Sequence, residues 1–153
     1  MPRKPTIRAF FDEPTNTVSY LVADPETKRA AVIDPVLDYD HASGKASTKS
    51  ADVILAAAAA EGVSVDWVLE THAHADHLSG APYIKLKTGA KVGIGEHIRD
   101  VQKIFRPVFN ATDLKGDGSE FDHLLADGER FALGNLTVEV VYTPGHTPAD
   151  VSY

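Results

Sequence analysis

The chain has 153 residues, of which 43% are apolar, and a formal net charge of −7, which fits one globular domain with a sizeable core. Lysine and arginine form no block, so nothing indicates a nucleic-acid surface. The sequence contains no cysteine, which excludes disulfides, zinc–thiolate clusters and a cysteine nucleophile. Imidazole and carboxylate groups would therefore have to hold any metal ion.

The sequence shows no targeting segment. Residues 1–16 include basic side chains but lack the apolar stretch of a secretory signal. No apolar run approaches the roughly 20 residues that a membrane-spanning helix needs. We therefore expect a cytoplasmic protein that does not bind a membrane.

The first predicted elements are two strands. Apolar and polar residues alternate over Thr15–Asp24, and a more apolar strand follows over Arg29–Pro35. The Asp24-Pro25 pair predicts a turn between them, so the strands should form an antiparallel hairpin. Residues Asp38–Ser50 are polar and rich in glycine and serine, which predicts a loop with His41 as a solvated residue.

A helix and a third strand come next. Ser50 is a candidate N-cap, the alanine-rich segment after it favours a helix, and Gly62 would end that helix. Its buried face is expected to comprise Val53, Ile54, Ala57 and Ala58. Val65–His72 is then predicted to be a buried strand with Trp67 in or against the core.

Shorter elements fill the rest of the chain. Residues 81–90 predict a helix that closes near Gly89, and residues 91–94 predict a strand. A further helix over residues 96–105 should place Ile98, Val101 and Phe105 on one face, with Pro107 shortly after its end.

The last third of the chain is predicted to contain a loop and two strands. Asn110–Glu120 is a flexible loop whose acidic residues lack the spacing of an EF-hand. A Gly134-Asn135 turn should join the two strands that lead to His146. His97 and His123 are expected to have structural or surface roles.

Three histidines and an aspartate directly follow the Val65–His72 strand, in the pattern His72-x-His74-x-Asp76-His77. Residues two apart in an extended segment point to the same side, so His72 and His74 could converge on one metal ion. A tight turn would let Asp76 and His77 face a second position. Imidazole suits Zn, Fe, Cu or Ni, and the cluster therefore predicts a metal site.

His146 lies on a distant turn. Pro144 and Gly145 predict a tight turn at a strand end, which would present His146 towards the same side as the cluster. Loops beyond the carboxyl ends of strands are where sites form in α/β proteins. His146 is therefore a fifth candidate metal ligand.

The segments THAHADH and TPGHT resemble the metallo-β-lactamase superfamily, whose signature is H-x-H-x-D-H followed by a further histidine. Residues 32–52, 69–85 and 94–110 are similar to the persulfide dioxygenases, also called sulfur dioxygenases, a group that includes bacterial β-lactamase-hydrolase-like proteins. Glyoxalase II is a nearby relative, but the long segment Asp38–Ser50 favours the persulfide dioxygenases.

The resemblance implies a non-haem Fe(II) enzyme that uses O₂ to oxidise glutathione persulfide to sulfite and glutathione. One iron per chain would be held by His72, His146 and an aspartate beyond residue 153, with His74, Asp76 and His77 close to it. Two histidines and one carboxylate leave positions open for O₂ and a substrate sulfur.

The alternative is a dinuclear zinc hydrolase of the glyoxalase II or lactamase-like type. The resemblance then implies that His72, His74 and His146 hold one zinc ion, and that Asp76 and His77 hold the other. Zinc would lower the pKa of a bound water for attack on a thioester or other acyl group. A non-catalytic module that keeps the fold and the histidines is a third reading.

The fold that the resemblance implies is an α/β four-layer sandwich, αβ/βα, with the metals at one edge between two similar halves. We expect residues 1–153 to be about the first half of one such metallo-β-lactamase-like domain, incomplete at its C-terminus, in a longer protein that forms a homodimer. The sheet should then expose a large apolar face. Relatives often have glycine and a small residue after PGHT; here Asp150 follows Pro148-Ala149 and should enter the next strand rather than bind the metal.

Overall fold

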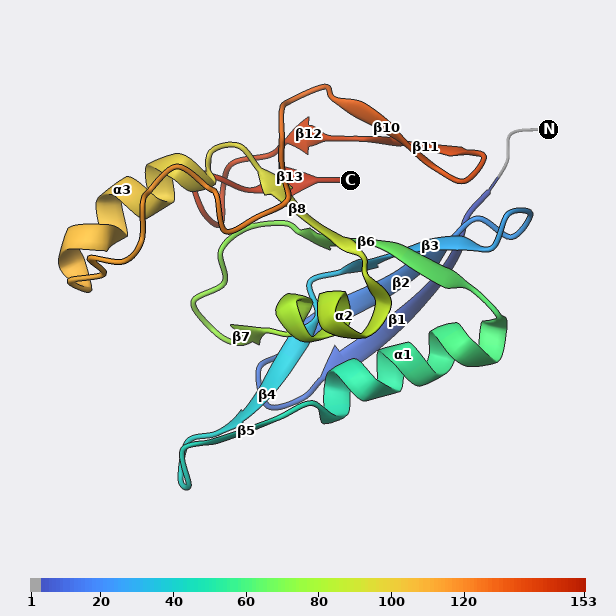
Figure 1. Cartoon of the computed structure of the whole chain (residues 1–153), viewed down its shortest axis with the longest axis horizontal. Helices are drawn as coiled ribbons and strands as arrows, with labels where there is room; N and C mark the ends of the chain where they lie inside the picture. Colours follow the sequence, from blue (N-terminus) through green and yellow to red (C-terminus); the bar gives the residue numbers. More distant parts are fainter. Residues whose placement is uncertain (1–3) are drawn as a thin grey trace.

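The computed structural model describes residues 4–153. A six-stranded sheet forms its centre, with α1 (Lys49–Glu61) and α2 (Ala81–Thr88) against one face and a small hairpin against the other (Figure 1). In spatial order its strands are β1 (Thr6–Asp12), β2 (Thr17–Ala23), β3 (Arg29–Ile33), β6 (Ser64–Glu70), β8 (Lys91–Gly95) and β9 (His123–Leu125). The first three pair antiparallel, and β3, β6, β8 and β9 pair parallel. One sheet and one helix layer are half of the expected sandwich.

The predicted hairpin is confirmed as β2 and β3, and Asp24 stabilises its turn. The carboxylate of Asp24 accepts hydrogen bonds from Thr27 Oγ1 at 2.6 Å and Glu26 N at 3.0 Å. It also accepts one from Asn135 N at 2.7 Å, which ties the turn to a distant part of the chain. Strand β1 is an element that the sequence analysis missed, because its side chains are mostly exposed and show no regular burial pattern.

The register between β3 and β6 shifts by one residue between Ala30 and Ala31, so that Asp66 of β6 has no partner on β3. The Asp66 carboxylate instead accepts a hydrogen bond of 2.6 Å from Arg29 Nε. Beyond this bulge, Leu69 lies in the apolar cluster on the sheet face opposite the two helices.

Helix α1 (Lys49–Glu61) ends at Gly62 as predicted, with a left-handed φ of 64°. It begins one residue before the expected cap: Thr48 is the N-cap, and Ser50 Oγ donates to Asp38 Oδ1 at 2.7 Å instead. The expected burial of Val53 is wrong, since Val53 is 56% exposed. Its place on the buried face is taken by Ala51, three residues before Ile54 and therefore on the same helix side.

Helix α2 (Ala81–Thr88) ends at Gly89 as predicted. Helix α3 (Ile98–Val108) runs further than expected and includes Pro107 in its last turn. This end of α3 projects beyond the sheet and leaves Phe105 47% exposed (Figure 1). Ile98 and Gln102 are the buried residues of the helix.

The predicted loop over Asp38–Ser50 is instead a hairpin of β4 (Val36–Asp40) and β5 (Lys45–Ser47), and β4 also pairs with β7 (Leu78–Ser79). Its glycine and serine form a tight turn: Gly44 N donates to Asp40 O at 2.8 Å, and Ser43 Oγ donates to the Asp40 carboxylate at 2.6 Å.

The second face of the sheet is partly covered by the predicted Gly134-Asn135 hairpin, which consists of β10 (Arg130–Leu133) and β11 (Leu136–Glu139). The pair β12 (Val141–Tyr142) and β13 (Val151–Ser152) follows. Trp67 packs on Phe131 of β10 with ring centroids 5.0 Å apart. An apolar groove of about 890 Å³ remains between hairpin and sheet, which matches the expected uncovered face. In the described part of the chain, every helix is too short or too polar to cross a membrane.

Candidate metal centre

The candidate centre begins where β6 ends, and Asp34 holds the first residue after that strand, Thr71, by hydrogen bonds. Asp34 follows β3, next to β6 in the sheet. Its carboxylate accepts two hydrogen bonds of 2.7 Å from Thr71, one from the backbone N–H and one from the hydroxyl. These hydrogen bonds connect the carboxyl ends of the adjacent parallel strands β3 and β6 next to the histidine cluster.

The structure brings all four predicted histidines together. The ring centroids of His72 and His74 are 4.0 Å apart, those of His74 and His77 4.1 Å, and those of His72 and His146 4.9 Å. The loop that carries His146 is tied to the cluster because Val151 N donates to the backbone oxygen of the residue before His72 at 3.0 Å.

Two carboxylates orient His74. Its Nε2 lies 3.0 Å from Asp34 Oδ1 and 3.3 Å from Glu70 Oε2. Burial lowers the pKa of His74, but the hydrogen bonds and negative charges of Asp34 and Glu70 outweigh it and raise the pKa to about 9. With Nε2 held in this way, Nδ1 is the nitrogen on the side of Asp76, 3.9 Å from Asp76 Oδ1.

Asp34 and Glu70 are site residues that were not predicted from the sequence. Glu70 is 3% exposed, and its Oε1 accepts a hydrogen bond from Ser79 Oγ. Burial raises the pKa of Glu70. The only available signal was position, since Asp34 and Glu70 are acidic residues at the carboxyl ends of β3 and β6.

The donor atoms of the cluster fit a metal ion. Within the described residues, His72 Nε2 and His77 Nε2 are buried and have no hydrogen-bond partner. Their other ring nitrogens are occupied: His72 Nδ1 lies 2.9 Å from Thr71 Oγ1, and His77 Nδ1 lies 3.4 Å from Asp76 Oδ1. Burial lowers the pKa of His72 and of His77, which favours the neutral imidazole that binds metals. A ring fixed through one nitrogen and free at the other is typical of metal-binding histidine.

A second grouping includes the exposed carboxylate. His74, Asp76 and His77 each offer one ligand atom, and these atoms lie within 4.8 Å of one another. The five predicted ligands thus surround one region, with His72 and His146 on one side and Asp76 and His77 on the other.

Asp150 behaves differently from the expectation. Its predicted entry into the next strand is wrong: β13 begins one residue later, and the Asp150 carboxylate turns back and accepts a hydrogen bond of 2.8 Å from Thr147 N. Its Oδ1 lies 3.7 Å from His72 Nδ1. Asp150 therefore stabilises the turn around His146 and faces the occupied nitrogen of His72, not the free one.

The remaining histidines have roles outside the cluster. His97 pairs with Asp100 and stacks on Tyr142, with ring centroids 4.6 Å apart. His123 Nε2 lies 2.6 Å from Glu129 Oε1, and His41 is exposed in the β4–β5 turn. These positions agree with the structural or surface roles expected for them.

The family follows from a comparison with known proteins. The sequence model of the metallo-beta-lactamase superfamily matches residues 12–153. The chain belongs to the metallo-β-lactamase superfamily. This confirms the resemblance and the α/β fold class inferred from the sequence. Members of the superfamily are metal-dependent hydrolases or oxidoreductases.

Within the metallo-β-lactamase superfamily, the chain is 47% identical over 149 residues to the β-lactamase hydrolase-like protein of Xylella fastidiosa, covering 97% of this chain and 35% of that protein. It is 31% identical to hydroxyacylglutathione hydrolase of Maricaulis maris, covering 91% and 43%. It is 26% identical to the mitochondrial persulfide dioxygenase ETHE1 of the mouse, covering 96% and 46%.

A solved structure gives the same assignment. The crystal structure of ETHE1 from Myxococcus xanthus superposes with a TM-score of 0.73 at 25% identity, covering 95% of this chain and 52% of that protein. The chain thus spans between about a third and half of the length of these relatives, as expected for part of a metallo-β-lactamase domain.

Proposed function

We propose that this chain is part of a non-haem Fe(II)-dependent persulfide dioxygenase. In this reaction glutathione persulfide, O₂ and water give glutathione and sulfite: the outer sulfur is oxidised, its bond to the glutathione sulfur breaks, and O₂ is reduced. The observation that carries a metal centre is the contact between the rings of His72 and His146, together with the buried, unpartnered Nε2 of His72. The likeness to ETHE1 in sequence and in structure supports the choice of substrate.

His72 and His146 would hold one iron ion, together with a carboxylate from beyond residue 153. Residues 1–153 would then be the N-terminal part of the catalytic domain. Bound iron would supply O₂ activation, for which protein side chains alone are unsuited. Asp34 and Glu70 hold His74 in one orientation, so that His74 would present a fixed polar edge to a substrate bound at the iron.

The surroundings of the cluster suit a small apolar substrate segment. A cavity of about 490 Å³ borders His72, His74 and His77, and its remaining wall combines apolar residues with Glu70, Ser79, Lys85 and Glu120. Its apolar lining residues include Ala73, Ala81, Pro82, Val92, Ile94 and Phe121. An apolar wall excludes water, which strengthens the interactions of the few polar groups that face the substrate.

A dinuclear zinc hydrolase acting on a glutathione thioester or another acyl substrate is the second candidate. The grouping of His74, Asp76 and His77 favours it, because Asp76 and His77 could hold a second metal ion beside the one at His72, His74 and His146. The likeness to hydroxyacylglutathione hydrolase supports the same reading.

Metal content and two substrates distinguish the candidates. Full-length protein purified without oxygen should contain one iron per chain and consume O₂ when glutathione persulfide is added. Two zinc ions per chain, with hydrolysis of a glutathione thioester and no O₂ uptake, would establish the hydrolase instead. Iron without O₂ uptake would contradict the dioxygenase. His41→Ala is the matched control, since His41 is exposed and outside the cluster, and it should leave metal content unchanged.

A further inference from the structure

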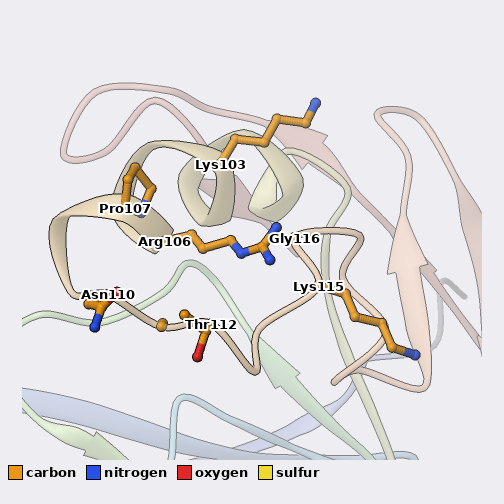
Figure 2. A pocket seen from close by; sticks show the side chains of 8 residues that line it. Lys103, Arg106, Pro107, Asn110, Thr112, Lys115 and Gly116 are labelled. Carbon is orange, nitrogen blue, oxygen red and sulfur yellow. The ribbon is translucent and has the colours of Figure 1, made fainter.

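A second cavity lies at the far end of α3. It has a volume of about 410 Å³ and is formed by the last turns of α3 and the segment that follows the helix (Figure 2). None of the four clustered histidines lines it. Three cationic side chains do, namely Lys103, Arg106 and Lys115, and no acidic side chain among residues 4–153 does. Three cations thus line one cavity in a chain with a net charge of −7, although Asp113 and Asp117 flank Lys115 in the sequence and the charge of Lys115 helps to lower the pKa of Asp117.

The cations come from two segments that meet at the cavity. Lys103 and Arg106 are three residues apart on α3 and so share one helix face. Figure 2 shows Arg106 extending from the helix towards Gly116, while the ammonium groups of Lys103 and Lys115 point outwards, away from Arg106. Lys103 has a weak exposed ion pair with Asp100 at 3.6 Å. Within the described residues, neither Arg106 nor Lys115 forms an ion pair.

The segment after α3 is held in place rather than loose. Gln102 is only 7% exposed, and both ends of its amide bond this segment: Oε1 accepts from Gly118 N at 2.9 Å, and Nε2 donates to Glu120 Oε2 at 2.8 Å. The backbone N–H of Ala111 donates to Arg106 O at 3.0 Å. A buried glutamine thus folds the segment back against the helix, and the cavity between them is preformed.

We propose that this cavity binds a compact phosphoryl anion of at least two negative charges, such as a diphosphate group. A guanidinium presents a planar fork of donors that matches phosphate oxygens, and lysine ammonium groups add mobile point charges. The Asn110 and Thr112 side chains in the wall add polar groups. A volume of about 410 Å³ exceeds the need of a single ion and suits a small ligand.

Calorimetric titration of the full chain with inorganic pyrophosphate tests this proposal. One pyrophosphate should bind per chain, and added salt should weaken the binding because the charges are exposed. Arg106→Gln and Lys115→Gln should each weaken it by about tenfold or more, since each removes a charge-assisted contact. Lys45→Gln, which removes the same charge from the exposed β4–β5 hairpin, should change it less than about twofold.

Four results would overturn the proposal. One is the absence of saturable binding up to roughly 5 mM pyrophosphate at low salt. Another is an equal loss in Lys45→Gln, which would show diffuse attraction to surface charge. Succinate binding as tightly as pyrophosphate would rule out a phosphoryl ligand. Loss of binding in His72→Ala would place the anion at the metal centre, whereas unchanged binding there supports a separate site.

Discussion

Replacing Asp34 by alanine should destabilise the chain more than any exposed substitution, because Asp34 bonds both Thr71 and His74. The change removes three hydrogen bonds to a buried carboxylate, at 2.7, 2.7 and 3.0 Å. Bonds to charged groups contribute about 1.5–3 kcal/mol each, so the loss should reach about 4 kcal/mol or more. Asp34 also has a positive φ of 47°, which costs alanine about 1 kcal/mol in addition.

Asparagine at the same position removes the negative charge of Asp34 but keeps nearly the same side-chain shape. Asp34→Asn keeps an acceptor for Thr71 and tolerates the positive φ, so the expected loss is about 1–2 kcal/mol. Urea unfolding of the metal-free chain, followed by fluorescence of the single tryptophan, Trp67, measures both. The exposed loop residue Asp113 provides the control Asp113→Ala, which should stay within about 0.5 kcal/mol of the parent chain. Equal stabilities for Asp34→Ala and Asp34→Asn would refute the reasoning.

Three further predictions concern metal binding, the turn at Gly134 and the pH dependence of stability. In the full-length protein, His72→Ala should abolish metal binding, whereas His74→Ala should reduce it less if one metal is bound and equally if two are bound; elemental analysis decides. Gly134→Ala should destabilise the chain by about 3 kcal/mol in urea unfolding, because φ is 61° and the new Cβ would lie 1.9 Å from a threonine oxygen. Gly128→Ala, with a φ of 74° but open space, should cost only about 1 kcal/mol. Hydrogen bonds, above all the one from the threonine hydroxyl of its turn, lower the pKa of Asp24 below its ordinary value of 3.8. The stabilisation of the folded chain by this carboxylate is therefore complete above pH 3.8 and is lost as the pH falls through the lower folded-state pKa. In urea unfolding, Asp24→Asn should differ in stability from the parent chain at pH 7 and converge with it in acid.

Elements with strong local signals were predictable from the sequence. Gly62 and Gly89 end their helices in the left-handed conformation, and Gly134-Asn135 forms the expected hairpin turn. Each of these depends on the conformational freedom of one or two adjacent residues, which a sequence displays directly. The histidine cluster was also predictable, because its spacing is local and is visible along the chain.

Features that depend on distant partners were not predictable. Asp34 meets His74 across 40 positions in sequence, and neither residue alone indicates the contact. The β4–β5 hairpin is held by an aspartate, a serine and a glycine that also suit an open loop. Val53 and Phe105 are apolar residues on helices, and only the angle at which each helix meets the sheet decides whether they are buried.

The bulge at Asp66 has a consequence for the histidines. Successive side chains of a strand point to opposite faces, so one extra residue exchanges the faces of everything after it. If Asp66 instead paired with Ala31, Leu69 would turn towards α1 and α2 and His72 would move to the other side of the strand end. Deletion of Asp66 would remove the bulge and leave Leu69 opposite Ile33, on its present face. A single unpaired residue six positions upstream of His72 therefore sets the side from which the imidazoles approach a metal ion. Any design that transfers this histidine loop to another parallel sheet would have to keep this register, either with the bulge or with Asp66 removed.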